Sequence, residues 1–188
     1  MILLKPYFYF PLLVLAILYV SLNRASPSMV YNCDGQEVIP TVLQAEKINE
    51  ALHLFKRTPR IKIRPILSFY IKTTQCYNAW ANMGKNSIII SQPVIENFTV
   101  EELAGILGHE FGHLESPYEV EHWRIDAIGI DLTSKKILIK ELGRMKLEID
   151  NSFWNNRLIY IFPLAHENRY ELYHDFESRI EKIKSLPD

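Results

Sequence analysis

The sequence predicts an α+β fold that is mostly helical with a small β-sheet, preceded by an N-terminal hydrophobic anchor helix. Three observations support this prediction. Several segments carry apolar residues at helical spacing behind N-terminal capping pairs. A short stretch in the first half shows the strand, turn and strand pattern of β-branched residues. An uncharged apolar run lies close to the N-terminus.

The N-terminal run, PYFYFPLLVLAILYVSL, covers residues 6–22 and carries no charge. A membrane-spanning helix needs roughly 17–25 apolar residues, so this run reaches the lower limit. A cleaved signal peptide is the alternative, although Asn23 at the −3 position of the best cleavage site is not a small residue. We expect a signal anchor or signal peptide at 1–24, a tether at 25–40 and one domain at 41–188. That domain is then membrane-anchored or exported, on the periplasmic or other extracytoplasmic side.

Composition narrows the class of protein. The chain has 188 residues, enough for one domain with its own core, and a net charge of −1 without a basic run. The sequence therefore predicts no nucleic-acid partner. In an exported protein, the pair Cys33 and Cys76 favours a disulfide, which would add about 4 kcal/mol on the chain-entropy model. Two buried free thiols are the alternative.

The first half of the domain should contain one helix and the sheet. A helix is expected at residues 41–57, opened by a Thr-x-x-Gln capping box and ended by Pro59. Residues 61–72 are rich in isoleucine and should be extended. A strand, a turn at 83–86 and a second strand around 88–90 follow.

The second half should be helical. A Thr-x-x-Glu capping box opens a helix at 99–114 whose apolar residues recur at helical spacing. A second helix is expected at 119–142, ending at Gly143, with further helices beyond it. Three glycines lower the helix propensity of the first segment, which suggests close packing or close approach of a substrate. They are Gly105, Gly108 and Gly112.

The motif HEFGH in the first of these helices predicts a metal site. His109 and His113 are four residues apart, so they lie on one helix face with about 5–6 Å between their Cβ atoms. Both imidazoles can then reach one Zn²⁺ at roughly 2.0–2.1 Å. Glu110 is rotated by about 100° from His109, which suits a general base better than a third ligand.

The third ligand should come from the next helix, because a catalytic zinc usually takes three protein ligands. Asp126 helps to choose among the candidates, since a ligating histidine commonly donates its other ring N–H to a carboxylate. His122 lies about 40° from Asp126 around a helix, whereas Glu121 lies about 140° away. Helical geometry therefore favours His122. The candidates are Glu115, Glu119, Glu121 and His122.

Three segments resemble the HtpX-like gluzincin family of membrane-associated zinc proteases, which includes the prenyl-protein (CAAX) protease, Oma-type and BepA-type branches. They are NAWANMGKNSIIIS, EELAGILGHEFGHL and RIDAIGIDL. The segment YHDFESRIEKIKSL is a weaker match to the family's terminal helix. The resemblance implies a zincin-like metalloprotease domain and a zinc endopeptidase, with His109 and His113 as ligands and Glu110 as the catalytic base.

The chain departs from this family at the third ligand. The family has a glutamate four residues before the aspartate, and here that position holds His122. Either the histidine replaces the glutamate, or the helix start adjusts so that Glu121 binds. Two histidines with a glutamate leave a formal site charge of +1, whereas three histidines leave +2, which should make a water ligand more acidic.

The resemblance also implies a substrate-binding strand before the active-site helix, where a peptide adds to the sheet edge. The corresponding residues are Asn78, Ala79, Trp80 and Ala81. A residue that stabilises the oxyanion should also exist, and the C-terminal segment offers several candidates. These are His166, Arg169, Tyr170 and His174.

The expected function is zinc-dependent endopeptidase activity on exported or membrane-associated unfolded proteins. Glu110 would move the proton, and Asp126 would orient a histidine ligand. A second hypothesis is a catalytically weak or inactive zinc-binding module with the same fold, in which the altered third ligand has reduced or abolished catalysis. A third is a zinc hydrolase acting on a non-peptide amide.

Overall fold

A computed structural model of the chain describes residues 33–60, 67–155 and 175–187. The predicted anchor at 6–22 lies outside these residues, and so do the four candidates for the oxyanion role. Among the helices that the structure describes, none is both long and apolar enough to cross a membrane.

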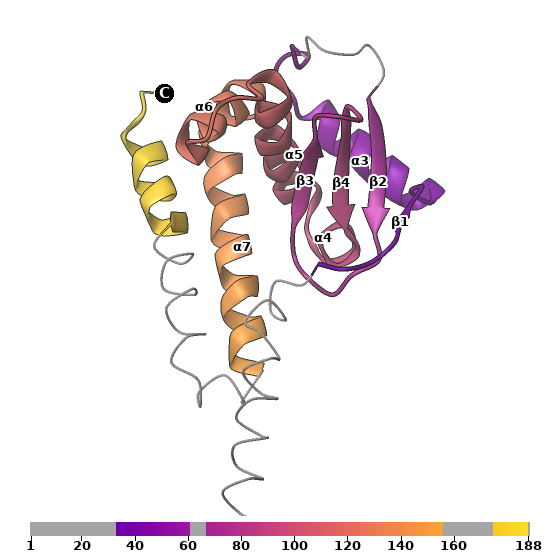
Figure 1. Cartoon of the computed structure of the whole chain (residues 1–188). Coiled ribbons are helices and arrows are strands. Elements are labelled where there is room, and N and C mark those ends of the chain that lie inside the picture. Colours follow the sequence, from indigo (N-terminus) through magenta and orange to yellow (C-terminus); the bar gives the residue numbers. More distant parts are fainter. Residues whose placement is uncertain (1–32, 61–66, 156–174, 188) are drawn as a thin grey trace, which may run out of the picture. The chain divides into compact units, whose positions relative to one another are not determined.

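The sheet has four strands in the order β1-β2-β4-β3 (Figure 1). It is mixed, because β2 and β4 run parallel while the pairs β1–β2 and β3–β4 are antiparallel. The predicted strand, turn and strand are confirmed as β3 and β4, and β4 is buried along its whole length. The bounds are β1 Glu37–Val38, β2 Ser68–Lys72, β3 Ala79–Asn82 and β4 Ser87–Ser91.

Residues 33–40, which we expected in the tether, contact the sheet. Their strand β1 was not predicted, because two residues are too few for a periodic pattern. Cys33 forms a disulfide with Cys76, in agreement with one of the two alternatives. A Cβ atom on Gly35 would lie 2.3 Å from the carbonyl oxygen of Thr73, so glycine permits this close approach.

Helix α3, Val42–His53, begins with the predicted capping box but ends four residues before the predicted end. After His53 the chain contacts other parts of the domain. Phe55 packs edge-on against Phe111, with ring centroids 5.5 Å apart, and the N–H of Lys56 donates to the carbonyl of Leu132.

Helix α5, Val100–Glu115, is the central helix of the domain, and it packs against α3, β3 and the two helices that follow it. Its predicted capping box is present, and nearly all of its residues are buried. The prediction of close packing at the glycines is confirmed at Gly112, where an added Cβ would lie 2.8 Å from the carbonyl oxygen of Ile125. The short helix α4, Gln92–Asn97, connects β4 to α5.

The prediction of one helix at 119–142 was wrong. The structure has two helices, α6 at His122–Leu132 and α7 at Lys135–Asn155. Two hydroxyls account for the break, because they compete with helical backbone bonds. Thr133 donates its hydroxyl to the carbonyl of Gly129, and the hydroxyl of Ser134 accepts the N–H of Ile137 at the start of α7. The predicted stop at Gly143 is also wrong, since α7 continues through it.

Residues 175–185 form a C-terminal helix that runs antiparallel to α7 (Figure 1). Lys135, at the start of α7, donates to the carbonyl of Leu186 at 2.6 Å. Further along α7, Lys146 forms an ion pair with Glu177 at 2.7 Å. These two contacts with α7 hold the C-terminal helix so that one of its faces points towards α5 and α6.

Candidate metal centre and its surroundings

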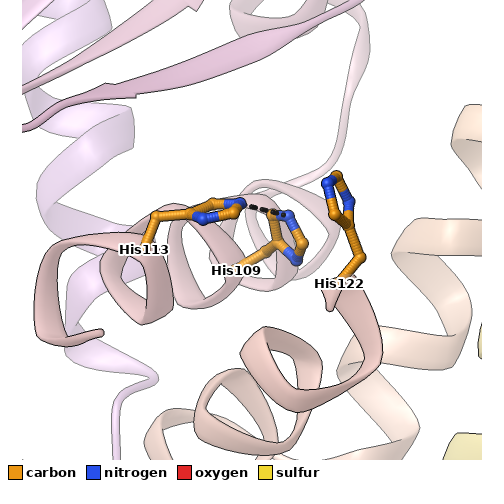
Figure 2. Close-up of side chains that lie close together, drawn as sticks. All are labelled: His109, His113 and His122. Atoms are coloured by element: carbon orange, nitrogen blue, oxygen red, sulfur yellow. Dashed lines mark hydrogen bonds between the residues drawn. The ribbon is translucent and has the colours of Figure 1, made fainter. Parts of the chain in front are cut away.

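The two histidines of the HEFGH motif lie side by side on α5 (Figure 2). His109 is buried and His113 is half-buried. Their Nε2 atoms are 3.2 Å apart. Two nitrogen ligands of one tetrahedral zinc, each at 2.0–2.1 Å, lie roughly 3.3 Å apart. The spacing of this pair therefore suits a shared metal ion.

His122 is the first residue of α6, and its ring faces the pair from across the helix junction (Figure 2). Its ring centroid lies 5.5 Å from those of both His109 and His113. One ligand nitrogen from each residue lies within 4.8 Å of the others. His122 is the exposed member of the set. The structure thus brings together the three histidines that the sequence singled out.

The other candidates for the third ligand have different partners. Glu115 accepts both Nη groups of Arg57, at 2.8 and 3.1 Å. Glu119 accepts the backbone N–H of Glu121 at 3.0 Å. The carboxylate of Glu121 accepts the indole N–H of Trp123. None of these three carboxylates belongs to the histidine cluster.

Asp126 lies behind the cluster and is fully buried. Its Oδ1 is 2.7 Å from Nδ1 of His109. Arg179 donates to both carboxylate oxygens of Asp126, at 2.7 and 2.8 Å. Nη2 of Arg179 also lies 3.2 Å from Nδ1 of His109, but it already donates to Asp126. The proton of His109 therefore belongs on Nδ1, which leaves the lone pair of Nε2 free for a metal ion.

Arg179 was not predicted as a site residue. It follows Asp126 by 53 positions, and no helical spacing links the two. The only signal was the loose resemblance of YHDFESRIEKIKSL to the terminal helix of a protease family. Burial opposes the charge of Arg179, yet its hydrogen bonds to Asp126 raise its pKa. Burial also disfavours the charged form of Asp126, but Arg179 and His109 outweigh it and lower the pKa of Asp126 to about 2.

The pKa values of two of the histidines favour metal binding. Burial, together with the neighbouring His109 and His122, lowers the pKa of His113 to about 4. Desolvation of the ring, together with Arg179 and His109, also lowers the pKa of His122. Both imidazoles are therefore neutral near pH 7, the form that can donate a lone pair to a metal.

Glu110 is buried between α5 and the edge strand β3. Burial raises its pKa, while His109, Arg179 and a hydrogen bond from the backbone N–H of Ala81 act in the opposite direction. A raised pKa makes the carboxylate a stronger proton acceptor, which suits a general base.

The four residues predicted to bind substrate lie along β3 and just before it. Within the described sheet, β3 is an edge strand that pairs only with β4. The N–H of Ala79 donates to the side-chain carbonyl of Asn78 at 2.9 Å, and that of Ala81 bonds to Glu110. All four residues, Asn78, Ala79, Trp80 and Ala81, line the same pocket as the histidines. Its volume is about 410 Å³.

The sequence model of Peptidase family M48 matches residues 44–163, which include the whole histidine cluster and β3. The match covers more than half of the chain, so the chain belongs to this family of metalloproteases. It ends before Arg179, which the structure adds to the site. No curated protein and no solved structure matches the chain significantly.

Proposed function

We propose that this metalloprotease is a zinc-dependent endopeptidase that uses His109, His113 and His122 as metal ligands. The observation that supports this most strongly is the convergence of three imidazoles beside a buried carboxyl, Glu110. Three neutral nitrogen ligands suit zinc, which takes imidazoles readily in tetrahedral sites. When bound, zinc supplies Lewis acidity for the scissile carbonyl and for a water molecule.

The protein's own residues then have separate roles. Glu110 accepts a proton from the attacking water and returns it to the leaving amine. Asp126 holds His109 in the Nδ1–H tautomer, and Arg179 keeps Asp126 ionised and fixed in place. The backbone N–H of Ala81 interacts with Glu110, so the base lies next to the edge strand.

The substrate is proposed to be an extended polypeptide. An edge strand next to a catalytic site can bind a peptide backbone by strand addition. The strand β3 meets this condition through Asn78, Ala79, Trp80 and Ala81. An extended segment must be free of other structure to bind in this way, which favours unfolded proteins as substrates.

The location of the protein is a further part of the proposal. We propose a signal anchor or signal peptide at 1–24, and a tether that begins at residue 25 and is shorter than the expected 25–40, since residues 33–40 contact the sheet of the protease domain. The disulfide between Cys33 and Cys76 supports export, because disulfides persist in oxidising compartments. The proposed substrates are accordingly exported or membrane-associated proteins.

Replacement of the base tests the function. Glu110→Gln should abolish cleavage of an unfolded protein such as reduced casein while zinc content stays at one ion per chain. Glu101→Gln is a matched control, because Glu101 is on the same helix but exposed and paired with Lys140. Chelation should remove activity from both the wild type and the control. Cleavage that persists in Glu110→Gln would contradict the proposal.

The altered third ligand favours a second candidate, a zinc-binding module with little or no activity. His122→Ala and Glu121→Ala separate the ligand assignments, since only the former should lose zinc. His122→Glu then tests the alternative function. If the wild type binds zinc but cleaves nothing, whereas His122→Glu cleaves unfolded protein, the natural histidine has turned the site into a binding module.

A further inference from the structure

A buried acidic side chain lies in the candidate active-site pocket and takes no part in the proposed chemistry. Glu141 on α7 lines the pocket together with the histidines and Glu110. Its side chain is almost completely buried, with 5% of the residue exposed. Among the described residues, its Oε2 atom has no hydrogen-bond partner. Buried polar groups are nearly always paired, so this atom needs an explanation.

The position of Glu141 is fixed by the packing of α5 on α7. A Cβ atom on Gly105 would lie 2.6 Å from the Cβ of Glu141, so the two helices touch at this point. Gly105 precedes His109 by one helical turn, and Ile106 between them also lines the pocket. The carboxyl of Glu141 is therefore close to the metal centre in space but belongs to a different helix.

Carboxyl groups outnumber cationic side chains in the lining of the pocket, and one of them has an oxygen without a partner among the described residues. The acidic groups that face it are Glu110, Glu141 and Asp175, with Asp126 just behind. The one described cationic side chain that lines it is Arg179, which is committed to Asp126 by two hydrogen bonds and lies 3.8 Å from Asp175. Burial, helped by the neighbouring carboxyls and opposed by Arg179, raises the pKa of Glu141 to about 8. Glu141 is therefore largely protonated near pH 7, and a cation beside it would favour its ionised form.

The walls of the pocket suit a long aliphatic stem. Much of its lining is apolar, and Ile106, Met145 and Phe176 are among these side chains. Lysine and arginine place their methylene stems on apolar surface while the charged group reaches a polar partner. A lining of this kind with one carboxyl matches such a side chain in shape and in charge.

We propose that this pocket is a specificity subsite for a lysine or arginine side chain of the substrate next to the scissile bond, with Glu141 as the partner of its charged group. The inference rests on the proposed endopeptidase function. Asp175 at the opening of the pocket would attract the same charge. The Oε2 atom of Glu141, which has no partner among the described residues, would then be paired in the substrate complex.

Peptide binding tests the subsite separately from catalysis. The full-length chain carrying Glu110→Gln is loaded with zinc and titrated with peptides that differ at one position, with lysine, arginine, methionine or aspartate. Fluorescence anisotropy should show roughly 10- to 100-fold tighter binding of the basic peptides than of the methionine peptide, as expected for a charge-assisted hydrogen bond. Adding Glu141→Gln should remove most of this preference, and Glu141→Leu should reverse it towards methionine.

Glu148→Gln is the matched control. Glu148 is a buried carboxyl two turns further along α7, but it pairs with Arg144 and does not line the pocket. This variant should keep the preference for basic peptides. Melting temperature and zinc content verify that every variant is folded and loaded. The subsite would be overturned if the ratio of the Kd values for lysine and methionine peptides were unchanged in Glu141→Gln. It would also be overturned if the chain with Glu141 intact bound basic peptides no more tightly than the methionine peptide.

The outcomes for the two proposals are distinct. If basic peptides bind selectively but the wild type cleaves none of them, the endopeptidase function fails, and the pocket stands only as a binding site for basic side chains. If the wild type cleaves peptides without regard to basic residues, the function stands and the subsite fails. If no peptide of any sequence binds, the proposed subsite is also overturned.

Discussion

Replacing Arg179 with methionine should destabilise the protein strongly. Asp126 is fully buried, and Arg179 supplies two of the three short hydrogen bonds to its carboxylate. Methionine fills a similar volume but leaves Asp126 with only His109. Breaking a buried ion pair by removal of one partner costs about 3–5 kcal/mol. For a domain of this size, that corresponds to a fall in melting temperature of roughly 6–20 °C.

Urea unfolding of the metal-free protein measures this effect. Lys184→Met is the control, because Lys184 is on the same helix and its ion pair with Glu181 is exposed. That pair should contribute at most about 1 kcal/mol. The double variant Asp126→Asn with Arg179→Met removes both charges and should recover at least half of the loss. If Arg179→Met costs no more than Lys184→Met, the buried pair does not hold the site together.

The remaining predictions concern two glycines in helices and the disulfide bond. Gly112→Ala should cost about 1–3 kcal/mol and weaken zinc binding, because the new methyl group would strike the backbone of Ile125 and push α6 away. Gly143→Ala, within α7 and with no atom near the added methyl group, should instead stabilise by roughly 0.5–1 kcal/mol in thermal melts. Replacing Cys33 and Cys76 with serine should cost up to about 4 kcal/mol, and a cost below 1 kcal/mol would contradict the chain-entropy account.

The sequence predicted those parts of the fold that local interactions determine. Both capping boxes formed where they were expected, at Thr41 and at Thr99, because a cap depends on residues three positions apart. The histidine pair His109 and His113 lies on one face for the same reason. Helical geometry also placed His122 beside them, since its relation to Asp126 depends on one turn of one helix.

Contacts between distant segments could not be predicted in this way. Arg179 and Glu141 reach the site only after α7 and the C-terminal helix fold back against α5, and no spacing in the sequence encodes this. The break at Thr133 and Ser134 left a local signal, since both hydroxyls cap backbone groups. The low helix propensity of Gly143 predicts a stop at that residue, but its surroundings in α7 are open and the helix continues.

The proposed use of His122 as third ligand, in place of a glutamate, would have an electrostatic consequence for the whole pocket. Zinc with three neutral histidines carries a formal charge of +2, one unit more than with a glutamate ligand. Asp126 cannot offset this charge, because Arg179 already neutralises it. The compensation must come from carboxyls that bind no metal, and Glu110 and Glu141 are the buried ones that line the pocket. The +2 charge favours the ionised forms of Glu110 and Glu141, and an ionised Glu141 can pair with a basic substrate side chain. The altered ligand and the proposed basic specificity are therefore linked through the ionisation of Glu141.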